Sequence, residues 1–492
     1  MIRQGTAPGH NLLYASKLIG LDKPNGGVRP IAIGDLIYRV ALKAILTLTF
    51  RPNMLLPCQL GVNSLGGVEP ATFLLQEAIT GLNKAKIKKI ASLDLSNAFN
   101  TISRTAIATS IAKYAPTFYK AAKWAYNQPS ILVTSNSNIL ASAEGVRQGD
   151  PLAPLLFSLA LRPTLEHIQA TLPKATIVAY LDNIYILSKD RDNLIDKAAQ
   201  AFANSPIKLN KAKCSEEYTT TLQQQGLDAL GTHIGPLSTR KSFLQAKLAT
   251  LTKALDMLRE MPKQYALLLL RGSIHLLLRH LLRQLDPEGL ALTWEYADTL
   301  ILNTISRLAT REIGSLSPIE HQKLIGLPVQ EGGLGIPSYA RLAAKLYIAA
   351  KEATRALLEQ IQPEVFYTIG PNSTIEPTLS AKQVLAEHNI ALLLALRLNQ
   401  EQENARLENA SFLGRQWLRV VPTQKQHQIA DPEATEAIRT RLLAPCKPTN
   451  RPCSYCASNP AIGHEDVCKG ASRHWTSRHN QVTRAFIKTL SS

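Results

Sequence analysis

The first half of the chain alternates between two hydrophobic periods. Between about residues 17 and 235, short β-branched or aromatic runs are bounded by turn-forming residues, which is typical of strands. These runs are VRPIAIG, KIASLDLS, SILVTS, TIVAYLDNIYILS and ALGTHIG. Between them, apolar residues recur every three or four positions, as in IYRVALKAILTLTF and EPATFLLQEAITGLNKA, which predicts helices. We therefore expect an α+β domain built on a small sheet.

The pattern changes after about residue 240, where the strand-like runs disappear. Long amphipathic runs such as QAKLATLTKALDMLREM and RLAAKLYIAAKEATRALLEQI predict helices as far as about residue 440, interrupted by a loop at LPVQEGGLGIPS. The most apolar run, YALLLLRGSIHLLLRHLLRQL, contains Arg271, Arg279 and Arg283, and arginines inside a membrane span are costly. We interpret this run as a core helix whose three arginines share one face, toward solvent or toward nucleic-acid phosphates.

Length and charge limit the possible functions. A chain of 492 residues is expected to form two to four domains, and 45% hydrophobic residues suffice for large cores. Lys and Arg number 55 against 37 Asp and Glu, which gives a net charge of +18. Such a surplus favours a polyanionic partner, nucleic acid first, although a merely soluble basic protein can have the same composition. The N-terminal residues lack the pattern of a signal peptide.

Two acidic residues stand at the ends of apolar strands. Asp94 ends the run KIASLDL, and Asp182 lies at the tip of VAYLDNIYIL. Carboxylates at the ends of adjacent strands can face one point and hold Mg²⁺, and two such ions support in-line phosphoryl transfer. Isolated aspartates more often occupy turns or cap helices, so either residue alone is a weak signal.

The stretches around these aspartates resemble, in order, the motifs of reverse transcriptases from non-LTR retrotransposons. KPNGGVRPIAIGDLIYRV resembles the fingers hairpin, and LDLSNAFN, RQGDPLAPLLF and AYLDNIYIL resemble the first three palm motifs. LNKAKC and LGTHIG resemble the remaining palm motifs, and LPVQEGGLGIPS resembles a stretch on the thumb side. The resemblance covers most of residues 17–345. It implies an α+β right-hand polymerase fold with fingers, palm and a helical thumb.

The resemblance also implies roles for individual residues. Asp94 and Asp182 would hold two Mg²⁺ (or Mn²⁺) ions, and Phe99 would be the steric gate that rejects a 2′-hydroxyl. The residues expected to contact the incoming nucleotide or its pyrophosphate are Lys23, Arg29, Gln148, Gly149 and Lys213. Each has a plainer alternative: the phenylalanine as core packing, the cations as solvated charges, and the glycine as part of a turn before a helix. Lys211 fits the last role equally well.

Position 183 departs from the family pattern. The third palm motif normally ends in two aspartates, whereas this chain has Asp182 followed by Asn183. An amide keeps an oxygen acceptor but loses a negative charge, so metal binding is expected to weaken. Asn183 stays among the candidate catalytic residues, yet an impaired or inactive nucleic-acid-binding relic is an open alternative. An RNA-templated RNA polymerase is a weaker one, against which Phe99 argues.

The C-terminal residues contain a metal-ligand pattern. Four residues have the order and spacing of the ligands of a Cys-Cys-His-Cys zinc knuckle: Cys453, Cys456, His464 and Cys468. Chance clustering of free thiols is the alternative, and Cys446 could replace one ligand. Reverse transcriptases of site-specific non-LTR elements carry a similar knuckle, and ASRHWTSRHNQVTRAF resembles the segment that follows it. The family also has DNA-binding fingers before the polymerase and an endonuclease after the knuckle, and we expect this chain to lack both.

These patterns together predict four segments: fingers and palm in 1–240, a helical thumb in 241–345, a helical linker in 346–440, and the zinc knuckle with a basic tail in 441–492. The expected function is RNA-directed DNA polymerase, a nucleotidyltransferase of a retrotransposable element. Its expected cofactors are Mg²⁺ (or Mn²⁺) and Zn²⁺. Its expected partners are an RNA template, a DNA primer or target, and deoxynucleoside triphosphates. We expect no membrane span, and the resemblance implies an intracellular, nuclear location.

Overall fold

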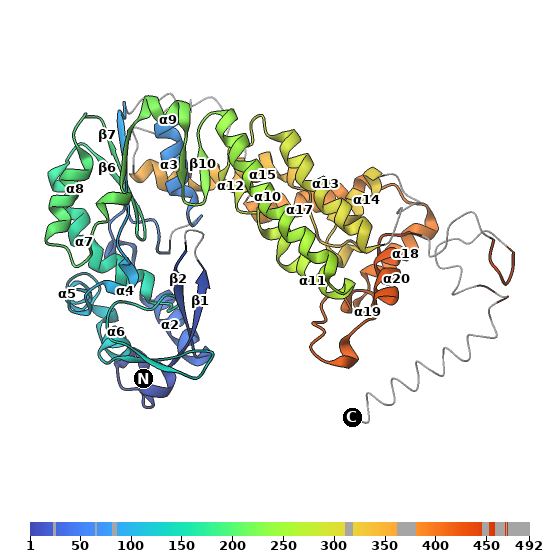
Figure 1. Ribbon diagram of the computed structural model, residues 1–492, viewed down its shortest axis with the longest axis horizontal. Helices are drawn as coiled ribbons and strands as arrows, with labels where there is room; N and C mark the ends of the chain where they lie inside the picture. Colours follow the sequence, from blue (N-terminus) through green and yellow to red (C-terminus); the bar gives the residue numbers. More distant parts are fainter. Residues whose placement is uncertain are drawn as a thin grey trace. The chain divides into compact units, whose positions relative to one another are not determined.

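The chain divides into two compact units. The computed structural model describes residues 1–22, 26–63, 66–80, 86–309, 318–361, 380–444, 452–457, 468 and 470 (Figure 1). The first unit comprises Met1–Thr239 with Ala350–Glu376, and the second comprises Arg240–Ala349 with Pro377–Ser492. The first unit mixes helices and strands, which confirms the predicted α+β class, whereas the described part of the second is built from helices.

The first sheet joins the N-terminal hairpin to a later one. Its order is β2 (Val28–Gly34), β1 (Ser16–Asp22), β4 (Ser130–Val133) and β5 (Ile139–Ser142). β1 and β2 are antiparallel, with Ser16 opposite Gly34, and β1 runs parallel to β4. The hairpin leads into helix α2 (Leu36–Thr49), whose N-terminus is capped by the Asp35 side chain accepting a hydrogen bond from the Ile37 N–H.

The second sheet contains the strands whose ends carry the predicted carboxylates. Its order is β6 (Thr176–Tyr180), β7 (Asn183–Ser188), β3 (Lys89–Leu93) and β8 (Ser215–Tyr218), and all neighbours are antiparallel. The register places Leu93 opposite Ile184, so these two side chains lie on the same face of the sheet. They share one hydrophobic core with Phe157 and other residues of helices α7 (Ala153–Thr171) and α8 (Leu194–Ala203).

Further elements complete the described part of the first unit. They are α1 (His10–Leu13), α3 (Glu69–Thr80), α4 (Ala98–Thr101), α5 (Arg104–Tyr114), α6 (Tyr119–Tyr126), α9 (Thr219–Gln225), and the hairpin of β9 (Leu227–Ala229) and β10 (Thr232–Ile234). Short 3-10 turns connect several of them, including one at Lys211–Lys213.

Amphipathic helices account for most of the described part of the second unit. In chain order the helices are α10 (Leu237–Met257), α11 (Lys263–Gly272), α12 (Leu281–Gln284), α13 (Ala291–Leu308), α14 (Pro318–Gly326), α15 (Tyr339–Ile361), α17 (Ala381–Ala395), α18 (Gln400–Ala410), α19 (Phe412–Gln416) and α20 (Asp431–Arg441). From Ala350 on, α15 belongs to the first unit. Leu244, Leu248, Leu251 and Leu255 recur at helical spacing along α10 and are buried. They belong to the same core as Trp294 of α13.

The glycine-rich loop LPVQEGGLGIPS is held by arginine side chains. Arg441 is fully buried, and its guanidinium donates to the carbonyls of Val329 at 2.6 Å and Gly333 at 2.8 Å. Arg271 donates to the Leu334 carbonyl at 2.7 Å. Backbone carbonyls therefore satisfy these two cations, and the loop is fixed by packing as well as by its glycines and prolines.

The most apolar run is not one continuous helix. The run Lys263–Gln284 is long and apolar enough to cross a membrane, with a mean hydropathy of 1.3, but core helices of soluble proteins pass the same test. Helix α11 ends at Gly272, because Ser273 leaves the helical conformation with φ −139° and ψ −61°. The prediction that Arg271, Arg279 and Arg283 share one helix face is therefore wrong.

Candidate active site

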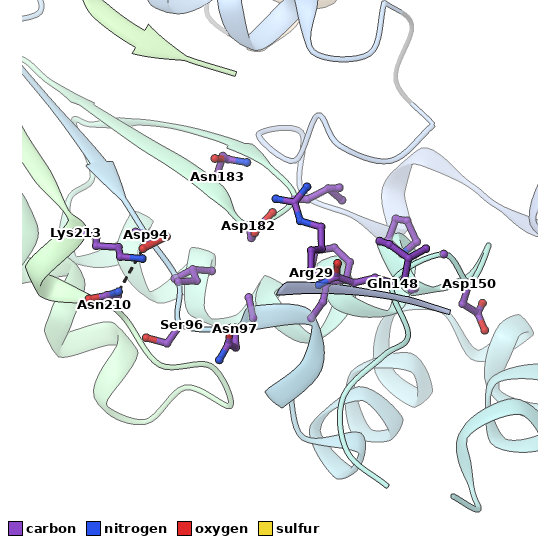
Figure 2. A pocket seen from close by; sticks show the side chains of 18 residues that line it. Arg29, Asp94, Ser96, Asn97, Gln148, Asp150, Asp182, Asn183, Asn210 and Lys213 are labelled. Carbon is purple, nitrogen blue, oxygen red and sulfur yellow. Dashed lines mark hydrogen bonds between the residues drawn. The ribbon is translucent and has the colours of Figure 1, made fainter. Parts of the chain in front are cut away.

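Residues from well-separated stretches of sequence meet at one cavity of the first unit. The cavity has a volume of about 920 Å³, and Figure 2 shows the side chains that line it. The sequence-predicted residues among them are Arg29, Asp94, Phe99, Gln148, Gly149, Asp182, Asn183 and Lys213. Lys23 lies outside the described residues.

Asp94 and Asp182 reach the cavity from neighbouring strand ends. β3 ends at Leu93, which pairs with Ile184 of β7, so Asp94 follows beside the tip of the β6–β7 hairpin. The hairpin turns through Leu181, whose φ of 57° is uncommon for a residue with a side chain, and then Asp182. Both aspartates line the cavity, and Figure 2 shows Asp182 projecting into it. The antiparallel register thus brings two acidic residues to the same edge of the sheet.

The two carboxylates interact electrostatically. Burial raises the pKa of Asp182 above its usual value, the charge of Asp94 raises it further, and the Arg29 guanidinium acts in the opposite direction. A raised pKa means that the ionised form of Asp182 is destabilised by its surroundings. A divalent cation bound by both carboxylates would relieve that destabilisation, so this pair has the chemistry of a Mg²⁺ or Mn²⁺ site.

Asp94 is held in place by the segment LNKAKC, in which only Lys211 and Lys213 were predicted to be functional residues. The Asn210 N–H donates to the Asp94 carbonyl at 2.9 Å, and the Asn210 side-chain amide lies 3.4 Å from Asp94 Oδ2. The Asp94 N–H donates to the Cys214 Sγ at 3.4 Å. Asn210 also lines the cavity (Figure 2). Its place in LNKAKC, three residues before Lys213, is the signal by which it could have been identified.

Gly149 fits its position only because it lacks a side chain. Its φ is +107°, and a Cβ there would lie 2.5 Å from the carbonyl oxygen of Ala32 on β2. Next to it, the Gln148 carbonyl accepts a hydrogen bond from the Ala32 N–H at 2.8 Å. This contact joins the loop of Gln148 and Gly149 to the strand that carries Arg29. The two predicted nucleotide-contacting segments are therefore fastened to each other.

Phe99 packs against another aromatic ring and also lines the cavity. Its ring stacks on that of Phe157 with centroids 4.5 Å apart and an interplanar angle of 12°. The side chain is half-buried and also lines the cavity. The Phe99 carbonyl accepts a hydrogen bond from the Val146 N–H at 2.7 Å, which fixes the backbone beside the loop of Gln148. A ring held in this way is rigid enough to limit the shape of a ligand.

The two candidate lysines differ in their surroundings. Lys213 lines the cavity, whereas Lys211 forms an ion pair with Asp196 at 3.3 Å. Of the two, Lys213 is the one that could contact a ligand in the cavity. Asn183 begins β7, is exposed, and in Figure 2 is set apart from the space between Asp94 and Asp182.

Three of the four predicted zinc ligands converge. The sulfur atoms lie within 4.8 Å of one another in Cys453, Cys456 and Cys468. The Tyr455 N–H donates to Cys453 Sγ at 3.5 Å and helps to lower the pKa of that thiol to about 7. A lower pKa favours the thiolate, which is the form that binds metal. His464 and Cys446 lie outside the described residues.

Comparison with known families agrees with the geometry. Residues 21–234 match the family model described as reverse transcriptase (RNA-dependent DNA polymerase). The Retrotransposable element SLACS 132 kDa protein of Trypanosoma brucei gambiense is 29% identical, over 45% of this chain and 19% of that protein. A Pol polyprotein from type-1 retrotransposable element R2 of Popillia japonica is 24% identical, over 51% of this chain and 47% of that protein. The chain thus spans less than half the length of these relatives.

Solved structures give only weak similarity. The apo telomerase of Candida tropicalis has a TM-score of 0.40 at 12% identity, over 82% of this chain and 69% of that chain. The telomerase of Candida albicans, solved with a fragment of telomeric RNA, has a TM-score of 0.39 at 11% identity, over 81% of this chain and 66% of that chain. Scores this low do not carry an argument about function.

Proposed function

We propose that residues 21–234, which match the reverse transcriptase family model, form a reverse transcriptase domain of the non-LTR retrotransposon type, and that the chain performs RNA-templated DNA synthesis for such an element. The observation that carries the proposal is the meeting of Asp94 and Asp182 at one cavity with Arg29, Phe99 and Gly149. The substrates would be an RNA template, a DNA primer and deoxynucleoside triphosphates. The net charge of +18 suits such polyanionic partners.

Each residue of the cavity has a distinct task in this proposal. Arg29 would attract the triphosphate, and the bare backbone of Gly149 would allow the nucleotide to approach closely. Phe99 would exclude a 2′-hydroxyl by contact with the sugar. Lys213 would donate a proton from Nζ to the leaving pyrophosphate. Mg²⁺ or Mn²⁺ held by Asp94 and Asp182 would supply positive charge to the attacking and leaving oxygens.

Asn183 supports a second candidate function, a nucleic-acid-binding relic with impaired catalysis. The exchange of an aspartate for an amide removes a charge near the metal-binding carboxylates. We favour activity because Asp182 is retained and projects into the cavity, whereas Asn183 is exposed. An exposed charge acts through water and contributes little to cation binding.

The rest of the chain has proposed roles that rest on the sequence. Residues 241–345 would form the thumb, 346–440 a linker, and 441–492 a zinc knuckle with a basic tail. Zn²⁺ bound by Cys453, Cys456 and Cys468, with His464 as the fourth ligand, would stabilise the fold of these C-terminal residues. A nuclear location would give the polymerase access to its DNA target.

Primer extension with the full chain tests the proposed function. The wild type should extend a DNA primer on an RNA template with deoxynucleotides, and should reject ribonucleotides. Phe99→Val should relax that rejection, because a smaller side chain leaves room for the 2′-hydroxyl. The ratio of ribonucleotide to deoxynucleotide incorporation is measured within one preparation, so it is insensitive to loss of folded protein. Extension by ribonucleotides alone, or nucleic-acid binding without extension, would contradict the proposal.

A further inference from the structure

A buried polar cluster adjoins the loop of Gln148 and Gly149, and one of its members, Asp150, also lines the cavity (Figure 2). Its centre is the ion pair between Arg147 and Asp150, whose Nη2 and Oδ2 atoms are 2.8 Å apart. Arg147 is 4% exposed and Asp150 is 6% exposed, so the pair is almost dry. A buried ion pair is costly unless its remaining donors and acceptors are satisfied, so its geometry must be well organised.

Both terminal nitrogens of the Arg147 guanidinium have partners, whereas its buried Nε has no hydrogen-bond partner among the described residues. Its Nη1 donates to the Tyr14 carbonyl at 2.5 Å and to Ser16 Oγ at 2.7 Å, and its Cζ lies 3.5 Å from the centroid of the Tyr14 ring. Tyr38 donates its hydroxyl to Asp150 Oδ2 at 2.5 Å and accepts from Arg147 Nη2 at 3.1 Å. Burial raises the pKa of Tyr38 well above its ordinary value, so the phenol keeps the proton that it donates.

These partners come from the elements on either side of β2, the strand that carries Arg29. Ser16 begins β1, and Tyr38 lies in the first turns of α2, directly after β2. Arg147 and Asp150 flank Gln148 and Gly149 in the chain, and the other carboxylate oxygen of Asp150 accepts from the Leu152 N–H at 2.9 Å. The cluster therefore connects β1, which pairs with β2, and helix α2, which follows β2 in the chain, to the loop that lines the cavity.

We propose that Arg147 is a positioning residue that fixes Gln148 and the Arg29-bearing hairpin relative to Asp94 and Asp182, and so sets the affinity for the incoming nucleotide. This inference rests on the proposed function. Arginine suits the role because its planar guanidinium holds five N–H donors on three nitrogens in a fixed fork and can stack flat on an aromatic ring. A lysine ammonium has its three donors on a single nitrogen and no flat face, so it cannot reproduce this geometry. Arg147 lies behind the cavity wall and acts through its neighbours.

The same unit contains a matched control. Arg162 Nε pairs with Glu166 Oε1 at 2.9 Å, and its guanidinium lies 4.1 Å from the centroid of the Tyr114 ring. The Tyr114 hydroxyl donates to Glu166 Oε2 at 3.1 Å, as the Tyr38 hydroxyl does to Asp150. Arg162 also donates to backbone carbonyls, including that of Met54 at 2.8 Å. This second triad does not line the active-site cavity.

The experiment compares Tyr38→Phe and Arg147→Lys with Tyr114→Phe and Arg162→Lys in the full chain. For each protein, steady-state primer extension gives kcat and the KM for a deoxynucleotide, and thermal unfolding gives the melting temperature. A fluorescent mant-deoxynucleotide, titrated onto the complex with template and primer, gives affinity without turnover. The tyrosine variants remove one hydroxyl and add no volume, so they keep the test valid where Arg147→Lys does not fold.

We expect Tyr38→Phe and Arg147→Lys to raise KM and weaken mant-nucleotide binding by roughly tenfold or more, the effect of losing hydrogen bonds to a charged group. Their kcat should stay near that of the wild type. The two control variants should lower the melting temperature but leave KM and nucleotide binding unchanged. Equal KM in both pairs, or a loss of kcat alone, would overturn the positioning role. A wild type that neither extends a primer nor binds the nucleotide would instead overturn the proposed function and this inference with it.

Discussion

Replacing Gly149 by alanine is the most informative single perturbation of the cavity wall. The added Cβ would lie 2.5 Å from the Ala32 carbonyl oxygen, closer than real Cβ atoms come to other atoms. To reach ordinary contact, the loop and β2 must separate by about 0.9 Å. That movement lengthens the 2.8 Å hydrogen bond from the Ala32 N–H to the Gln148 carbonyl. The substitution therefore acts on the junction between the two segments that we propose contact the nucleotide.

The size of the effect follows from two contributions. A side chain at a φ of +107° is strained by roughly 1–3 kcal/mol, and the lost hydrogen bond adds about 1 kcal/mol. The free energy of unfolding should therefore fall by roughly 2–4 kcal/mol. Activity should suffer more than stability, because a displacement of about 1 Å in a positioning element can lower the rate roughly a hundredfold.

Gly231→Ala separates backbone strain from displacement. Gly231 has a φ of +84° between β9 and β10, and a Cβ there would meet no atom within 4 Å. This variant should lose stability through strain alone and keep its kcat/KM for deoxynucleotides. Melting temperatures and primer-extension kinetics of both variants make the comparison. If Gly149→Ala keeps the kcat/KM of Gly231→Ala, the contact with β2 does not position the nucleotide and the reasoning fails.

Three further predictions concern the carboxylates and the thiols. Asp182→Asn should raise the melting temperature at neutral pH in the absence of divalent cations, because it removes a carboxylate whose raised pKa marks an unfavourable buried charge. Differential scanning fluorimetry should show that this gain in melting temperature fades as the pH falls through the raised pKa of Asp182, where the wild-type carboxylate becomes protonated. Asn183→Asp should raise primer-extension activity at low Mg²⁺ by less than about tenfold, since an exposed charge contributes roughly 1 kcal/mol or less to the free energy of cation binding. A larger gain in activity would show that the amide of Asn183 was the main defect. Cys453→Ser should abolish the binding of stoichiometric zinc, measured by mass spectrometry of metals. The control Cys58→Ser should keep its zinc, because burial raises the pKa of Cys58 to about 12 and so disfavours the metal-binding thiolate. Zinc retained by both variants would exclude the knuckle.

The strands of the first unit were predictable because their side chains alternate or form short β-branched runs. KIASLDL and TIVAYLDNIYILS became β3, β6 and β7, and their carboxylates came together because β3 and β7 are neighbours in the sheet. Asn210 was not predicted, because its role depends on a backbone bond to Asp94 that no local pattern encodes. The cluster of Arg147 with Tyr14 and Tyr38 depends on residues more than a hundred positions apart, so only the folded chain reveals it.

The second unit was less predictable in detail. Apolar periodicity continues through Ser273, so the sequence indicated one helix where the chain leaves the helical conformation. Arg441 also carries no sequence signal, because its partners are backbone carbonyls, which every residue type has. Three arginines of the most apolar run suggested a nucleic-acid surface. At least one of them, Arg271, instead holds the glycine-rich loop.

Primer extension by the aspartate variants tests the central claim most directly. The wild-type chain, Asp94→Asn, Asp182→Asn and the control Asp196→Asn would each be given an RNA template, a DNA primer and deoxynucleotides across a titration of Mg²⁺ and Mn²⁺. Asp196 is an exposed carboxylate paired with Lys211, outside the cavity. We expect metal-dependent extension by the wild type and by Asp196→Asn, and none by either cavity variant. Extension that survives Asp94→Asn or Asp182→Asn at any metal concentration would contradict the central claim.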